Sequence, residues 1–85
     1  MKPILFSLEH CPKCDTIKNL IISKGIDVDI ITLPHDYKDW SADNKLLVRE
    51  YDVLDDLQIT APILVLEKTK IIGQLRIQKY LMKVV

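Results

Sequence analysis

Uninterrupted apolar runs alternate with stretches of mixed apolar and polar residues along the chain. Four segments are apolar and partly β-branched, as buried strands are; they cover residues 2–8, 26–33, 62–66 and 70–72. Three segments repeat apolar residues at helical spacing; they cover residues 12–24, 41–52 and 74–83. The stretch 53–60, VLDDLQIT, fits either a helix that continues past a kink or a turn.

The ends of these segments carry start and stop signals. Pro12 suits the first position of a helix, where no N–H donor is needed. Lys24 and Gly25 give a cation in the last turn and then a residue suited to a left-handed cap. Ser41 can cap the second helix, and Pro62 is tolerated because it stands at the start of a strand. The remaining polar segments are a loop at residues 34–39 and a hairpin turn at residues 67–70.

The elements follow the order β-α-β-α-β-β-α. The first two strands are joined through a helix, so they should be parallel with a right-handed crossover, whereas the last two form a hairpin. We therefore predict one α/β domain over residues 1–85, with a four-stranded mixed sheet flanked by three helices. The residues of the last helix expected to face inward are Leu75, Ile77 or Gln78, Leu81 and Met82.

Composition and charge narrow the class of protein. Of the 85 residues, 48% are apolar, which favours a folded domain over a disordered chain. Twelve basic and twelve acidic residues cancel, which argues against a nucleic-acid or membrane-surface binder. No apolar run suits a signal peptide or approaches the ~18–20 residues of a membrane span. We therefore expect a cytoplasmic protein with no membrane partner.

The two cysteines of the chain lie between the first strand and the first helix. Cys11 and Cys14 are three positions apart, which places them on one face of the helix. Cys14 shares a stripe with Ile17 and Ile21 and should point toward the core, whereas Cys11 should stand at the exposed tip. Thiol–disulfide exchange needs this asymmetry, because one thiol attacks and a shielded one resolves.

The start of a helix also favours a thiolate, because its free N–H groups and its dipole stabilise negative charge. Lys13 adds a cation beside the Cys11 sulfur, Asp15 opposes it, and His10 contributes if protonated. We predict that the Cys11 thiolate attacks a substrate disulfide. Cys14 then attacks the Cys11 sulfur and releases the reduced substrate.

The cysteine pair has two other interpretations. A structural zinc site wants four ligands, and only His10 and His35 are available as further ligands, so we expect no metal site within one chain. A metal shared between two chains stays open. Inert packing is the other alternative, because buried cysteines are common, but it does not explain the position of Cys11.

These features resemble the glutaredoxins, a family within the thioredoxin-like fold. The CPKC motif at Cys11 to Cys14 is similar to the family's C-P-Y-C signature. TAP at residues 60–62 stands where the family has T-V-P, and IIG at residues 71–73 stands where it has a strand followed by G-G. The resemblance covers nearly the whole chain, and the element order agrees with it.

The resemblance implies a dithiol–disulfide oxidoreductase that binds no cofactor and is re-reduced by glutathione. It implies a cis Ala61–Pro62 bond, with Pro62 against the cysteine pair and the Ala61 backbone offered to the substrate backbone. The substrate would be a protein disulfide or a glutathione mixed disulfide, and we expect a monomer. The substrate-binding residues that the resemblance implies are Pro12, Lys13, Thr60, Ala61, Pro62, Gly73, Gln74 and Arg76.

The chain departs from the family at the expected glutathione contacts. Leu8 stands where the family usually has a lysine that holds a glutathione carboxylate, and Gln74 replaces the second glycine. Lys13 replaces the aromatic residue and could take over the role of the lost lysine. Arg76 aligns with the acid that receives the glutathione amino group, and a cation repels an ammonium.

These departures leave two other functions open. One is a thioredoxin-like electron donor to a protein such as ribonucleotide reductase, re-reduced by a thioredoxin reductase. The other is a metal or iron–sulfur carrier that uses Cys11 between two chains.

Five residues outside the cysteine motif are also candidates for a role in packing or binding. Tyr37 and Trp40 flank the second helix, and we interpret them as buried anchors. His35 and Asp36 are interpreted as a solvated turn. Arg76 is the exposed charge that we expect to recognise a partner.

Overall fold

A single four-stranded sheet separates two pairs of helices in the computed structural model, which describes residues 2–67 and 69–83. The strands are β1 (Ile4–Leu8), β2 (Asp29–Leu33), β3 (Ile63–Val65) and β4 (Lys70–Ile72). Their order across the sheet is β2-β1-β3-β4; β1 pairs with β2 in parallel, and the other two pairings are antiparallel. The predicted mixed sheet is confirmed.

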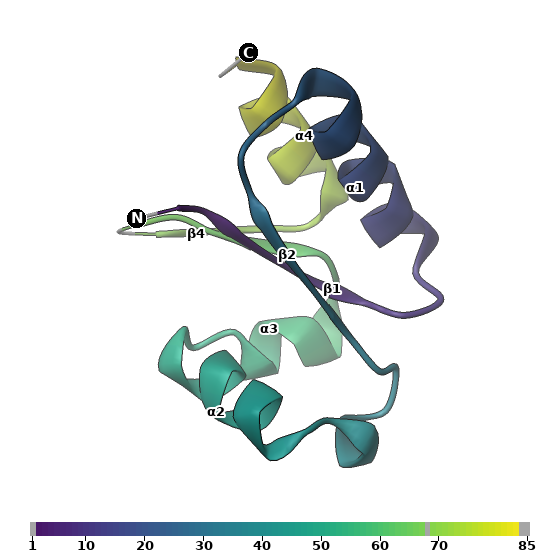
Figure 1. Ribbon diagram of the computed structural model, residues 1–85, viewed down its shortest axis with the longest axis vertical. Coiled ribbons are helices and arrows are strands. Elements are labelled where there is room, and N and C mark those ends of the chain that lie inside the picture. Colours follow the sequence, from purple (N-terminus) through teal and green to yellow (C-terminus); the bar gives the residue numbers. More distant parts are fainter. Residues whose placement is uncertain (1, 68, 84–85) are drawn as a thin grey trace.

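Four α-helices lie within the described ranges, one more than predicted. They are α1 (Pro12–Lys24), α2 (Ala42–Glu50), α3 (Leu54–Ile59) and α4 (Gln74–Lys83). A short 3-10 helix, η1 (Tyr37–Asp39), lies in the loop predicted after β2. Figure 1 shows α1 and α4 on one face of the sheet and α2 and α3 on the other.

The additional helix forms in the stretch that the sequence left open. Asp52 adopts a left-handed backbone conformation, with φ of 55°, and this breaks the chain after α2. The Val53 N–H donates to the Val48 carbonyl at 3.1 Å, closing the end of α2. The chain then restarts as α3 because Leu57 is buried in the core below the sheet. The second helix therefore ends at Glu50 rather than near residue 52.

The first three strands are shorter than predicted because each strand residue needs a partner, whereas β4 has the predicted bounds. The second strand was expected from residue 26 but begins at Asp29, opposite Ile4, where β1 itself begins. The preceding residue Ile26 instead donates its N–H to the Ile21 carbonyl at 3.1 Å, completing the end of α1. Toward the opposite edge of the sheet, the Leu66 N–H donates to the Thr69 carbonyl across the turn between β3 and β4. Residue 68 of that turn lies outside the described residues.

Adjacent residues of β1 serve opposite faces of the sheet, because side chains alternate along a strand. Leu5 packs on the side of α1 and α4, with Ile17, Ile21, Leu64, Ile77 and Leu81. Phe6 packs on the side of α2 and α3, in a cluster that also contains Cys14, Leu33, Trp40, Val48 and Leu57. The two clusters hold the helices on both sides of the sheet and thereby position the loop that carries Cys11.

The inward face of α4 differs from the prediction. Ile77 and Leu81 are buried as expected, and Gln78 is half-buried, but Leu75 is 73% exposed and Met82 is also exposed. Residues four apart lie on one face of a helix, whereas Leu75 is two positions from Ile77 and therefore points away from it.

No helix of the described residues is long and apolar enough to cross a membrane.

Candidate redox site

Cys11 lies at the junction between the central strand and α1. β1 ends at Leu8 and α1 begins at Pro12, so a short link turns the chain, with His10 in a left-handed conformation at φ 56°. Cys11 is the N-cap of α1, and its Sγ accepts a hydrogen bond from the Cys14 backbone N–H at 3.2 Å. The sulfur therefore occupies the place that a serine or aspartate oxygen takes in other helix caps.

Cys14 is fully buried, whereas Cys11 is half-buried, and both are free thiols. Burial, followed by the neighbouring Cys11 sulfur, raises the pKa of Cys14 to about 12. Desolvation has this sign because a thiolate loses more on leaving water than a neutral thiol does. The predicted asymmetry of exposure between the two cysteines is therefore present.

The TAP segment joins α3 to β3. The Ala61–Pro62 peptide bond is cis, as the resemblance implied. Pro62 is fully buried, and its carbonyl accepts the Gly73 N–H at 3.1 Å. This bond ties the segment to the start of α4. The expected contact of Pro62 with the cysteine pair and the pairing of the Ala61 backbone with a substrate stay predictions.

A first groove, the Cys11 groove, runs beside the exposed cysteine and has a volume of about 450 Å³. Four of the predicted binding residues line it together with Cys11: Pro12, Lys13, Thr60 and Ala61. Residues of β1, α1 and the link between α3 and β3 therefore form a groove beside Cys11, and a substrate can approach the Cys11 thiol through this groove.

A second groove, the Arg76 groove, has a volume of about 320 Å³ and lies between the starts of α1 and α4. It is lined by the other predicted residues, Gly73, Gln74 and Arg76, and it shares Lys13 and Thr60 with the Cys11 groove. Of the predicted substrate-binding residues, Pro62 is the one that lines neither groove. Its side chain is fully buried, and its role in substrate binding stays a prediction.

The Cys11 groove also contains residues that the sequence analysis did not assign to it. Ile59, at the end of α3, is 85% exposed at its rim. His35 lines it too, because β1 and β2 are parallel and their carboxyl ends place the loops after Leu8 and Leu33 side by side. The position of His35 after a parallel strand was a signal that could have found it; nothing in the sequence marked Ile59.

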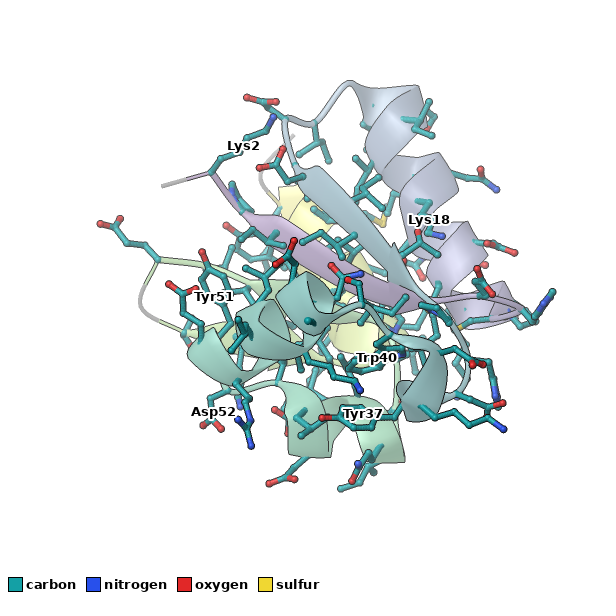
Figure 2. All side chains as sticks on the ribbon, turned by 60° about the horizontal axis from the view of Figure 1, so that its bottom comes forward. Lys2, Lys18, Tyr37, Trp40, Tyr51 and Asp52 are labelled. Atoms are coloured by element: carbon teal, nitrogen blue, oxygen red, sulfur yellow. The ribbon has the colours of Figure 1, made fainter. Side chains whose placement is uncertain are left out.

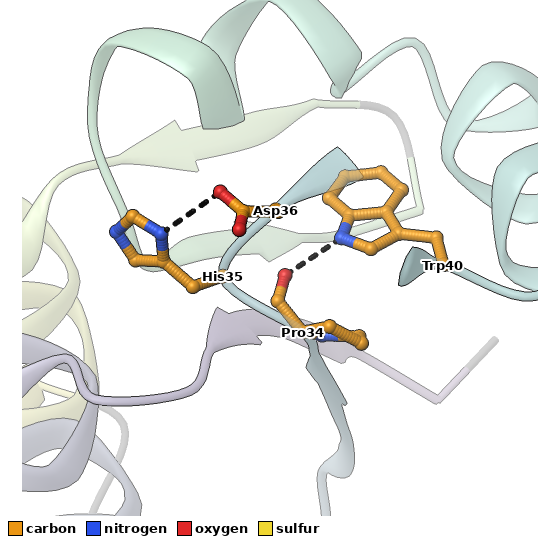
Figure 3. A network of polar contacts seen from close by, with 4 residues as sticks. All are labelled: Pro34, His35, Asp36 and Trp40. Carbon is orange, nitrogen blue, oxygen red and sulfur yellow. Dashed lines mark hydrogen bonds and ion pairs between the residues drawn. The ribbon is translucent and has the colours of Figure 1, made fainter. Parts of the chain in front are cut away.

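The loop after β2 is held by Trp40 rather than by its histidine. The Trp40 indole N–H donates to the Pro34 carbonyl at 2.7 Å, while His35 and Asp36 are exposed and 3.5 Å apart (Figure 3). Trp40 is buried, as predicted, but Tyr37 is largely exposed. The Tyr37 ring packs against the Trp40 ring, with centroids 5.0 Å apart (Figure 2). Tyr37 therefore covers the buried Trp40 from the solvent side and is not itself a buried anchor.

The part of the chain that the structure describes contains no group of three His, Cys, Asp or Glu side chains arranged to hold a metal ion.

The chain was compared with known proteins. It matches no protein family, and no curated protein is similar to it in sequence. The crystal structure of a glutaredoxin from Archaeoglobus fulgidus is similar in structure, with a TM-score of 0.60 over 85% of this chain and 74% of that chain. The two sequences are 17% identical over this match. At that identity the likeness shows the fold, which is a glutaredoxin-like thioredoxin fold.

Proposed function

We propose that this protein is a thiol–disulfide oxidoreductase in which Cys11 attacks and Cys14 resolves. The observation that carries the proposal is the contrast between the two sulfurs. Cys11 Sγ caps α1, is accessible from a groove and accepts the Cys14 N–H at 3.2 Å. Cys14 is buried one turn further on, with its pKa raised to about 12.

The first step uses the Cys11 thiolate. Its sulfur forms a bond to one sulfur of the substrate disulfide, the substrate S–S bond breaks, and the released thiolate takes a proton from water. The N–H groups at the start of α1 stabilise the thiolate before the attack. Cys14 does not compete for this step, because a thiol with so high a pKa is protonated near neutral pH.

The second step uses Cys14. Its sulfur loses a proton and attacks Cys11 Sγ, the mixed disulfide breaks, and the second substrate thiol leaves. The protein dithiol has then given two electrons to the substrate and carries a Cys11–Cys14 disulfide. Two glutathione thiols return it to the dithiol and become glutathione disulfide. Lys13, which lines both grooves, is a cation that can bind a glutathione carboxylate.

The experiment is reduction of a small mixed disulfide with glutathione, glutathione reductase and NADPH, with Cys11→Ser as the blank. We expect NADPH consumption well above the blank, and we expect Cys14→Ser to accumulate a stable mixed disulfide that mass spectrometry detects. If the wild type forms its internal disulfide but glutathione does not reduce it, the electron source is different and thioredoxin reductase is tested next. If Cys11 exchanges with no disulfide, the proposed function is wrong.

A further inference from the structure

The Arg76 groove has an unbalanced charge. Two charged side chains line it, Lys13 from the start of α1 and Arg76 from the start of α4, and both are cations. Its other lining residues are uncharged. Neither Lys13 nor Arg76 makes an ion pair with a carboxylate within residues 2–67 and 69–83. The two positive charges are therefore available to a ligand.

The groove opens beside the reactive sulfur. Lys13 is two residues after Cys11, and it lines both the Arg76 groove and the Cys11 groove, as does Thr60. A small molecule joined to Cys11 through a disulfide can therefore extend past Lys13 into the Arg76 groove. The charge of the group it places there affects the rate at which it reacts.

Two cations in a concave site attract an anion and repel an ammonium. Arg76 also offers a planar guanidinium that can bind a carboxylate through two hydrogen bonds. The volume, about 320 Å³, lies at the small end of the range for small-molecule sites. This size favours a small ligand over a segment of a partner protein.

We propose that the Arg76 groove selects small thiols that carry an anionic group, such as a carboxylate, and rejects those that carry an ammonium in its place. The inference rests on the proposed function of Cys11. In the reaction it governs, Cys11 Sγ bonds one sulfur of the disulfide of such a thiol, the S–S bond breaks, and the other thiol leaves and takes a proton. The anionic group stays in the groove during the exchange.

The test uses the Cys14→Ser protein, in which the mixed disulfide persists, and three symmetrical disulfides. Dithiodipropionate carries two carboxylates, bis(2-hydroxyethyl) disulfide is neutral, and cystamine carries two ammonium groups. The rate of mixed-disulfide formation is measured by intact mass at low ionic strength. Each rate is divided by the rate of the same disulfide with 2-mercaptoethanol, which removes differences in intrinsic reactivity.

Two charge reversals on α4 locate the effect. Arg76→Glu changes the groove, whereas Lys83→Glu makes the same charge change at an exposed position seven residues further along the helix, about 10 Å away. We expect the normalised rates to fall from carboxylate to neutral to ammonium, by about fivefold for each step, the effect of one close charge pair in water. Arg76→Glu leaves one cation and one anion in the groove and should therefore remove most of this order, whereas Lys83→Glu should keep it. Added salt should flatten the order in the wild type.

Each other result overturns the inference. Equal normalised rates for the three disulfides would leave Cys11 as the nucleophile and the proposed function intact, but no charge selection. The expected order, unchanged by Arg76→Glu, would place the selection at another group. No mixed disulfide with any of the three would overturn the proposed function and the inference with it.

Discussion

Cys14 differs from Cys11 by one helical turn and by its surroundings. It belongs to the buried cluster that contains Phe6 and Leu33. A thiolate is costly there, so the pKa is raised to about 12 by burial first and by the Cys11 sulfur second. If Cys14 resolves the mixed disulfide as we propose, that step depends on a thiolate that is rare near neutral pH.

The pH dependence of this step is a direct prediction. Below the pKa of Cys14, the thiolate fraction rises about tenfold for each pH unit. Burial, the larger cause of the raised pKa, persists when Cys11 is in a mixed disulfide. The mixed disulfide is formed at low pH, the pH is jumped, and thiol release is followed. We expect the rate to rise about tenfold per unit between about pH 7 and 9. If the rate of thiol release stopped rising at about pH 8.5, the ordinary pKa of a cysteine thiol, the raised pKa of Cys14 would be contradicted.

At the scale of the element, two helices begin with a side-chain cap. α1 uses the Cys11 sulfur, and α2 uses Ser41, whose Oγ accepts the Asn44 N–H at 3.1 Å. In the proposed function the first cap also serves chemistry, whereas the second contributes to stability, since Ser41 is exposed and lines no groove near Cys11. The two can therefore be separated by experiment.

Ser41→Ala should lower the free energy of unfolding by about 1 kcal/mol, because it removes the acceptor for the Asn44 N–H. Ser41→Asp keeps an acceptor and should restore most of the loss. Urea denaturation measures both, and disulfide exchange at Cys11 should be unchanged in both. Equal stability of the alanine variant and the wild type would show that the cap contributes nothing to the fold.

At the scale of the whole molecule, the sheet depends on helices packed on both faces. α1 and α4 lie together on the Leu5 face, where Ile77 and Leu81 of α4 join Ile17 and Ile21 of α1. This contact also sets where Arg76, one residue before Ile77, stands relative to Lys13. The contact between α1 and α4 therefore both packs the core and brings together the residues of the Arg76 groove.

Ile77→Ala should lower the free energy of unfolding by about 2–5 kcal/mol, because it leaves a cavity between α4 and the sheet. Leu75→Ala, on the same helix but 73% exposed, should change it by less than about 0.5 kcal/mol. Urea denaturation compares the two. A larger loss for Leu75→Ala than for Ile77→Ala would mean that α4 turns a different face to the sheet.

The local features were predictable because they depend on neighbours in the chain. Pro12 and Gly25 define the first helix, and Ser41 defines the start of the second. The stripe that Cys14 shares with Ile17 and Ile21 turns Cys14 inward, whereas Cys11 stands at the tip of the helix. Helix α3 was not predictable, since its short segment is stabilised by the burial of Leu57 and by the break at Asp52. Propensity alone does not form a helix of this length.

The amino-acid sequence by itself determined the order of the elements, their capping residues and the unequal exposure of Cys11 and Cys14, because periodicity and capping act over a few residues. Only the tertiary structure decided what surrounds Cys11. His35, Thr60 and Arg76 come from separate elements, and the sheet order β2-β1-β3-β4 with the packing of α4 on α1 brings them to the two grooves. The physical reason is that long-range proximity follows from burial on both faces of one sheet, which no local pattern encodes.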